Sequence, residues 1–249
     1  MRLLRYGDPF LTGVGEITDA DDRGRSFALW REEPHYSADQ AADVYLRFDF
    51  LVEVDLLDAF TALGGLGEDG FAARAALRRR GDLMLAPSFS TIWIDAALNI
   101  VPLGGLRALL DRPYRPVARG QGPYHDINVN ARRWQRVKAI GIDVVAHWAE
   151  LCTKGRQTAE ALLRADPDFI AKLRAAETDA AEADYARITQ LEVRLRQDPD
   201  GLSGQLDLER AIATATRQGI IQPRVRLETI GAVFLTGSAA VTDRMMGGE

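Results

Sequence analysis

The chain has 249 residues, with 47% hydrophobic and 27% charged side chains, a balance typical of an ordinary globular protein with one large domain or two small ones. Its net charge of −5 argues against a globally nucleic-acid-binding surface, because nonspecific affinity comes from neutralising phosphates. A single cysteine, Cys152, excludes disulfides within the chain and multi-cysteine metal clusters. The lack of an apolar run of roughly 20 residues or a signal-peptide core predicts a cytoplasmic protein without a membrane partner.

Residues 1–125 are the first of three segments, a sheet-containing half in which short apolar runs alternate with glycine and proline. Near its start, Asp8 and Pro9 are typical of an N-cap and a first helical residue, and they predict a short helix through Ile17. Residues 25–31 follow a turn. They predict the first strand, because apolar or partly aliphatic side chains occupy every second position.

Residues 43–55 predict the best-defined strand of the chain. Apolar side chains occupy every even-numbered position from 44 to 54, a period of two that has no good helical explanation. The odd positions are largely charged, so we expect one face on a core and the other in solvent, as in a mainly antiparallel sheet. A helix over 68–80, ended by Gly81, and a strand over 88–94 complete this half.

Residues 126–219 are the second segment, a long helical excursion rich in alanine. Apolar or small residues at steps of three and four predict one long amphipathic helix over 127–163. A second helix is expected over 168–197 and a third over 203–217. The short Asp-Pro-Asp-Gly turn between these two predicts an antiparallel helical hairpin.

Residues 220–249 are the third segment, and residues 224–235 return to strand character. A strand at this point can rejoin the sheet of the first half, which would make the three segments one composite domain. The expected fold is therefore α+β: a mainly antiparallel sheet with short helices, plus a long helix and a helical hairpin inserted before a final strand.

Gly65, Gly67 and Gly70 form a G-x-G-x-x-G pattern, in which backbone N–H groups can meet a pyrophosphate at a helix N-terminus. Asp95 ends the next predicted strand roughly where a ribose-binding acid would lie. Two carboxylates inside the loop would repel a diphosphate, and no second βαβ unit follows. The glycines therefore favour a flexible connector, with dinucleotide binding as the alternative, and we expect no cofactor.

The sequence predicts no catalytic residue and no metal site. A Walker A motif is excluded because Lys138 is the first lysine of the chain, and a serine-histidine-aspartate triad would lack its G-x-S-x-G elbow. The three histidines are far apart, without the spacing of zinc ligands. His125 is the best candidate for an acid–base group, although a helix N-cap region at Asp126 explains it more simply.

Two groups of cations stand out. Arg78, Arg79 and Arg80 end a predicted helix, where positive charge favours the C-terminus. The second group lies in a proline-rich loop and at the start of the predicted long helix; its members are Arg112, Arg115, Arg119, Arg132, Arg133, Arg136 and Lys138. Trp134 lies among them, and arginines interleaved with an aromatic suit phosphate contact and base stacking. These seven residues are a candidate nucleic-acid surface, and the alternative is a solvated helix face with Trp134 turned to the core.

Taken in order, these elements resemble the C-terminal region of the RapA (HepA) family, Swi/Snf-type ATPases associated with bacterial RNA polymerase. They look closer still to DpdE-like helicase-related proteins of bacterial DNA-modification and defence gene clusters. The resemblance lies in the opening residues 4–10, the first strand at 22–31, the strand ending in acidic residues at 46–53 and the final strand at 224–235. It covers nearly the whole chain and depends on the pattern and order of the elements.

The resemblance implies a noncatalytic accessory or regulatory module from an ATP-binding, DNA-binding hydrolase. Its partners would be the ATPase lobes of the parent chain, and RNA polymerase, DNA or RNA. The helicase motifs that bind ATP are missing, so the family's catalytic residues have no counterpart here. Two alternatives stay open. One is a small-molecule or nucleotide-dependent enzyme that uses the loop from Gly65 to Gly70 or His125, and the other is a stand-alone adaptor that forms a homodimer through the helical hairpin.

Overall fold

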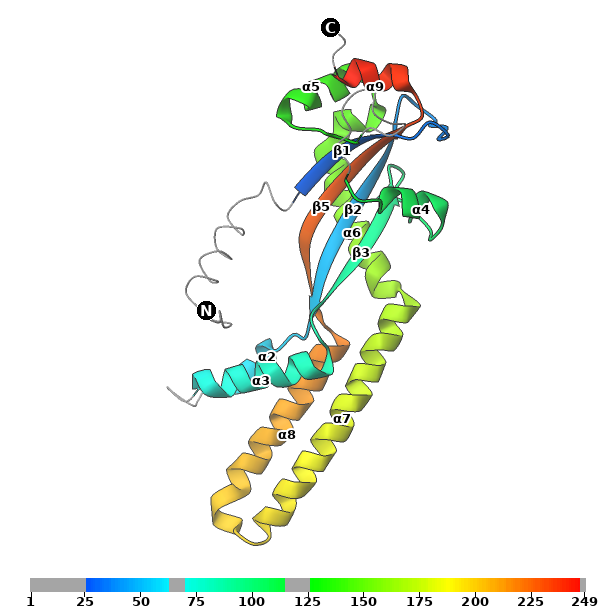
Figure 1. The fold of residues 1–249 in the computed structure, drawn as a ribbon. Helices are drawn as coiled ribbons and strands as arrows, with labels where there is room; N and C mark the ends of the chain where they lie inside the picture. Colours follow the sequence, from blue (N-terminus) through cyan, green and yellow to red (C-terminus); the bar gives the residue numbers. More distant parts are fainter. Residues whose placement is uncertain (1–25, 63–69, 115–125, 247–249) are drawn as a thin grey trace, which may run out of the picture. The chain divides into compact units, whose positions relative to one another are not determined.

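The computed structural model describes residues 26–62, 70–114 and 126–246 and has mixed helices and strands (Figure 1). In chain order the elements are β1 (Ser26–Glu32), β2 (Asp43–Glu53), α2 (Leu57–Ala62), α3 (Gly70–Met84), β3 (Ser88–Asp95), α4 (Gly105–Leu110), β4 (Asp126–Asn128), α5 (Ala131–Ile140), the 3-10 helix η3 (Asp143–His147), α6 (Trp148–Ala165), α7 (Pro167–Leu195), α8 (Pro199–Ile221), β5 (Arg224–Thr236) and α9 (Ala239–Met246). No helix within these ranges is long and apolar enough to cross a membrane. The helix predicted over 8–17 lies outside the described residues.

The strands form one five-stranded, mostly antiparallel sheet in the order β3-β2-β5-β1-β4. The final strand rejoins this sheet, as predicted, and lies between β2 and β1. It pairs in parallel with β1, from Ser26 opposite Ile230 to Glu32 opposite Thr236, whereas β4 pairs with β1 antiparallel. The predicted α+β class with a mainly antiparallel sheet is therefore confirmed.

The described residues divide into two compact units, each made of separate stretches of the chain. The first unit contains residues 26–49, 91–114, 126–160 and 227–246, and the second contains residues 50–62, 70–90 and 161–226.

Strand β2 has the predicted period of two. Its even-numbered side chains are all at most 2% exposed; they are Val44, Leu46, Phe48, Phe50 and Val52, and Val54 just beyond the strand continues the pattern. The opposite face is half-buried rather than largely solvated. In the first unit, Tyr45 and Trp93 on that face pack with Leu110 of α4, while Gly155 of α6 approaches Phe48 on the other. This part of the sheet therefore has a helix on each side.

The residues predicted to form one long helix form four elements instead: β4, α5, η3 and α6. Asn130 begins α5, since its side chain accepts a hydrogen bond from the Arg133 N–H at 3.0 Å. Gly141 ends α5 in the left-handed region, with φ 82°, a conformation that glycine adopts without steric cost. The steps of three and four residues continued across this break, so periodicity alone predicted an uninterrupted helix.

Gly81 does not end α3, which continues to Met84. Gly81 is buried, and a Cβ atom there would lie 3.3 Å from the Leu56 side chain. The glycine thus serves a close approach inside the second unit rather than a helix stop.

The helical hairpin of the second unit is confirmed. The Asp166 carboxylate caps α7 by accepting the Phe169 N–H at 2.8 Å, and Pro167 occupies the first turn. Helix α8 begins at Pro199 and ends at Ile221, longer at both ends than predicted. The two helices run side by side in opposite directions (Figure 1).

Gly219 of α8 provides a test of the packing in this unit. The Asp55 N–H donates to its carbonyl oxygen at 3.2 Å, and a Cβ atom at Gly219 would overlap the Asp55 carbonyl oxygen. We expect Gly219→Ala to lower the free energy of unfolding by about 1–3 kcal/mol, measured by urea denaturation followed by far-UV circular dichroism.

Gly204→Ala in the same helix is the control, because that site is exposed with no atom within 4 Å. It should raise the same quantity by about 0.5–1 kcal/mol. Equal stability of the two variants would contradict this account of the packing.

Candidate functional site

Helix α5 carries four of the predicted cations, and two of them hold the helix in place. Arg133 Nη1 donates to the carbonyl oxygen of Asn128 at 2.8 Å. Arg136 Nη1 donates to the carbonyl oxygens of Met245, at 3.2 Å, and Met246, at the end of α9. The bond from Arg133 joins α5 to β4. The bonds from Arg136 join α5 to α9 and satisfy carbonyl groups that the end of α9 leaves without helical partners.

The three arginines of α5 lie on one side of the helix. At 100° per residue, Arg132, Arg136 and Arg133 fall within an arc of roughly 100°, whereas Lys138 lies away from it. Arg132 is exposed, and Arg133 and Arg136 are half-buried. None of the three forms an ion pair with a carboxylate of the described residues. Carbonyl acceptors leave the guanidinium charge in place, so this side of α5, which we call the arginine face, carries three positive charges that no described acid compensates.

Arg112, unlike the three arginines of α5, forms ion pairs with described carboxylates. Its guanidinium lies 3.3 Å from the Glu33 carboxylate and 3.8 Å from that of Asp126. Both acids are at most 15% exposed, so the structure places Arg112 in an ion-pair cluster rather than on the arginine face. Arg115 and Arg119 lie outside the described residues.

Trp134 is turned inward. Its ring lies 4.9 Å from that of Trp148 and 6.1 Å from that of Phe234, measured between centroids, both edge to face. Such pairs stabilise a core beyond the area that they bury. Trp134 is half-buried, and its ring faces the buried Phe234. The structure therefore agrees with the alternative in which Trp134 is turned to the core, and the arginine face has no base-stacking contribution from this residue.

An apolar cavity of about 960 Å³ lies beneath α5, in the first unit. It is lined by residues of β1, β5 and α5–α6, among them Phe27, Leu29, Ile230, Trp134, Trp148 and Cys152. Lys138 also lines this cavity. The structure therefore places Lys138 on a different side of α5 from the arginine face. Burial raises the pKa of the Cys152 thiol, which disfavours the thiolate and hence nucleophilic chemistry there.

A polar cluster that the sequence did not predict lies at the start of β2. The Tyr36 hydroxyl contacts the Asp43 carboxylate and lies 2.8 Å from the Tyr45 hydroxyl. Burial and the hydrogen bond to Asp43 raise the pKa of Tyr36, and burial raises that of Tyr45, so both phenols stay protonated at neutral pH. Asp43 and Tyr45 are two residues apart and share a face of the strand, which is the signal that the sequence contained.

The alternative sites are only partly within the described chain. Gly65, Gly67 and His125 lie outside it, and Gly70 is the first residue of α3. Asp95 ends β3, where its carboxylate accepts hydrogen bonds from the Ala97 N–H at 2.9 Å and the Asn99 N–H at 2.8 Å. The Asp95 carboxylate therefore closes a local turn. Because Gly65 and Gly67 lie outside the described residues, the pairing of Asp95 with the glycine loop stays a prediction. The described residues contain no cluster of histidine, cysteine or acidic side chains suited to a metal.

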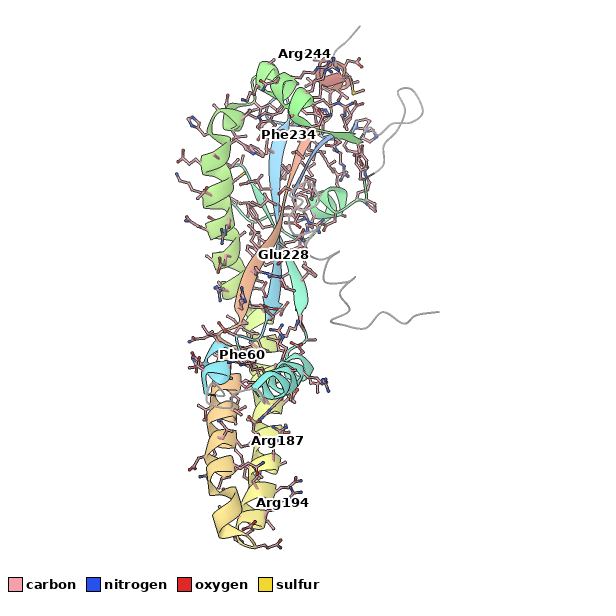
Figure 2. The ribbon with its side chains drawn as sticks, turned by 90° about the vertical axis from the view of Figure 1, so that its left-hand side faces the viewer. Phe60, Arg187, Arg194, Glu228, Phe234 and Arg244 are labelled. Atoms are coloured by element: carbon pink, nitrogen blue, oxygen red, sulfur yellow. The ribbon has the colours of Figure 1, made fainter. Side chains whose placement is uncertain are left out.

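A network of charges joins three helices of the second unit. Arg80 of α3 contacts the Asp184 carboxylate of α7 and donates to Glu209 of α8 at 2.7 Å. Arg187, labelled in Figure 2, donates to the same Glu209 oxygen at 2.9 Å. The Arg217 Nε atom lies 4.0 Å from Asp184, whose side chain is 5% exposed. The network fixes the hairpin against α3, and it uses one arginine of the predicted cluster at 78–80.

The other members of that cluster have different surroundings. Arg78 donates to Glu53 at 2.8 Å and pairs with Asp82 at 3.1 Å, and Arg79 is exposed.

Compared with known proteins, the sequence matches no protein family and no curated protein at a significant level.

Proposed function

We propose that this chain is a noncatalytic accessory module of a nucleic-acid-dependent, Swi/Snf-type ATPase, and that the arginine face of α5 binds the phosphate backbone of its nucleic acid. The observation that carries the proposal is the set of three guanidinium groups within one arc, without an ion pair to a described carboxylate. In a chain with a net charge of −5, such a local excess of positive charge favours an anionic partner.

The surroundings of the arginine face support phosphate contact rather than base recognition. Arg133 and Arg136 are anchored by backbone carbonyl oxygens, so their guanidinium groups are held in position before binding. Arg132 is the exposed member, and its planar fork of donors suits phosphate oxygens. Trp134, the aromatic side chain of this helix, packs inward. We therefore expect weak dependence on base sequence and strong dependence on salt.

Replacing Arg132 tests the proposed function directly, because its exposed side chain has no anchoring role among the described residues. We expect the full chain to bind a labelled duplex or single strand in fluorescence anisotropy, with an affinity that falls as salt rises. Arg132→Ala should weaken binding for all sequences alike and reduce the slope of log affinity against log salt by about one. Arg132→Glu should weaken binding further, since it adds a repulsive charge.

Arg156→Ala is the matched control, because Arg156 is exposed on α6 in the same unit and lies outside the arginine face. It should bind like the unchanged chain. Absence of binding by the unchanged chain at low salt, or equal losses in the Arg132 and Arg156 variants, would rule out the arginine face as a nucleic-acid surface.

The accessory role calls for a second measurement, with the ATPase lobes. We expect the chain to change the nucleic-acid-stimulated rate of ATP hydrolysis by those lobes, and to hydrolyse no ATP itself. The arginine face would bind the same nucleic acid as the ATPase lobes. The Arg132→Glu variant should therefore lose the effect on ATP hydrolysis, while the Arg156→Ala variant keeps it. An effect that survives Arg132→Glu would contradict the proposed link between the two.

A further inference from the structure

Helix α7 has a second ordered face, opposite the one that packs on α8. The packed face contains the buried residues Leu173, Ala176, Ala180 and Asp184. Half a turn away, side chains at steps of three and four form an exposed stripe, which we call the α7 stripe: Glu182, Tyr185, Thr189, Val193 and Arg196. Tyr185 is 75% exposed and Val193 50% exposed. The two large apolar side chains thus lie on one solvent-facing side of the helix, with a carboxylate before them and a guanidinium after them.

The α7 stripe is symmetric about Thr189. Tyr185 and Val193 lie four residues before and after it, and Glu182 and Arg196 lie seven residues before and after it. A twofold axis through Thr189, perpendicular to the helix, would therefore bring each member of the stripe against its counterpart in a second copy. Such self-complementarity is what an interface between identical chains requires.

We propose that two copies of this chain form a dimer by pairing their α7 helices in antiparallel orientation, with the twofold axis at Thr189. Each Tyr185 ring then covers Val193 of the other copy. Each Glu182 carboxylate meets an Arg196 guanidinium, and symmetry makes both contacts twice. The steps of three and four residues are those that let two helices pack along a common seam.

Charge selects the antiparallel orientation. In a parallel pair, Glu182 would face Glu182 and Arg196 would face Arg196, and both contacts are repulsive. Neither side chain forms an ion pair with a residue in the described part of its own chain, so the charges need not break such a pair to meet a partner. The network at Asp184 also holds α7 in a fixed position against α3, so little conformational freedom is lost on pairing.

The size of the α7 stripe sets the expected strength. It spans four turns of helix, or roughly 21 Å, so the interface is at the small end of specific interfaces. We expect a dimer that dissociates on dilution. The pairing does not depend on the proposed nucleic-acid contact, because α5 and α7 belong to different units and share no residue of either surface.

Sedimentation of the full chain over a wide range of concentration tests the pairing. The mass should rise from that of the 27.4 kDa monomer toward twice that value. Glu182→Arg and Arg196→Glu should each weaken the dimer at least tenfold, because each single change places like charges together twice. Both sites are exposed, so neither change should affect folding, and circular dichroism checks this.

The decisive sample is an equimolar mixture of the two single variants. In a dimer of Glu182→Arg alone, both contacts join two positive charges, and in a dimer of Arg196→Glu alone, both join two negative charges. In a mixed dimer, by contrast, each contact joins opposite charges. Dimerisation should therefore return in the mixture, and also in the Glu182→Arg, Arg196→Glu double variant.

Oxidative crosslinking tests the position of the twofold axis. Thr189→Cys in a Cys152→Ser background should form a disulfide-linked dimer on oxidation, because the axis brings the two copies of this position together. Thr178→Cys in the same background is the control, since Thr178 is also exposed on α7 but lies outside the stripe. It should form no such dimer.

Each other outcome overturns the proposal. A monomer at every concentration excludes the dimer, and a dimer insensitive to both charge reversals places the interface elsewhere. Single variants that dissociate without recovery in the mixture exclude the pairing of Glu182 with Arg196. Nucleic-acid binding by Arg132→Glu is measured separately, so failure of the dimer and failure of the arginine face are distinguishable.

Discussion

Asp184→Ala is expected to lower the free energy of unfolding of the second unit by about 3–5 kcal/mol. The Asp184 side chain is 5% exposed and contacts Arg80, with Arg187 at 3.8 Å and Arg217 at 4.0 Å. Its removal leaves Arg80 and Arg187 with Glu209 as their shared acid and Arg217 with Glu177. A charge that is taken from water and loses part of its compensation retains a desolvation cost. The loss is measured by chemical denaturation followed by the helical signal.

Asp179→Ala is the matched control for this prediction, because Asp179 lies on the same helix and is exposed. Its effect should stay within about 0.5 kcal/mol. Asp184→Asn should fall between the two, since it keeps the shape and one acceptor but removes the charge. If Asp184→Ala costs no more than Asp179→Ala, the network does not hold the hairpin against α3.

The elements that the sequence predicted well are those whose signal is local. Strand β2 was predictable because alternation over eleven residues fits a strand and excludes a helix. The start of α7 was predictable because aspartate followed by proline is a helix start by itself. The final strand could be placed in the sheet because the chain returns to period two after the hairpin. Its parallel pairing with β1 was not predictable, since it depends on partners at opposite ends of the chain.

Two of the errors came from glycine, whose role depends on its neighbours in space. Gly141 and Gly81 each stand inside a helical pattern in the sequence. Gly141 adopts a left-handed conformation and ends α5. Gly81 is an interior residue of α3, where the lack of a Cβ atom lets the Leu56 side chain pack closely. A conformational preference allows both outcomes, so tertiary contacts decide between them.

The candidate site was predictable as a set of cations on a helix, but not as a site. Their spacing in the sequence places Arg132, Arg133 and Arg136 on one side of a helix. The ion pairs of Arg112 were not predictable, because one of them joins it to Glu33, which is distant in the chain. The same limit applies to the acids. Nothing in the sequence near Asp126 indicates that it pairs with an arginine 95 residues earlier.

That arginine, Arg31 of β1, is fully buried. Its guanidinium forms a bidentate pair with the Asp126 carboxylate, at 2.7 Å and 3.0 Å. The remaining donors satisfy the carbonyl oxygens of Leu109, Leu110 and Arg112 at the end of α4. One side chain thus neutralises a buried acid and caps a helix, two tasks for which the planar fork of arginine is suited.

We therefore expect Arg31→Ala to lower the free energy of unfolding of the first unit by about 3–5 kcal/mol, because the buried Asp126 carboxylate loses its bidentate pair and the α4 carbonyl groups lose their donor in the same step. Arg31→Lys should recover only part of this loss, since an ammonium group cannot form the bidentate pair. Arg47→Ala is the control: Arg47 also pairs with an acid but is 32% exposed, so its loss should stay below about 1 kcal/mol.

A double-mutant cycle with Asp126→Ala separates the contribution of the Arg31–Asp126 pair from the capping of α4 by Arg31. If pairing dominates, the double variant should be far more stable than the sum of the two single losses predicts, because it removes both charges of the bidentate pair together. Additive losses would show that Arg31 acts mainly through α4.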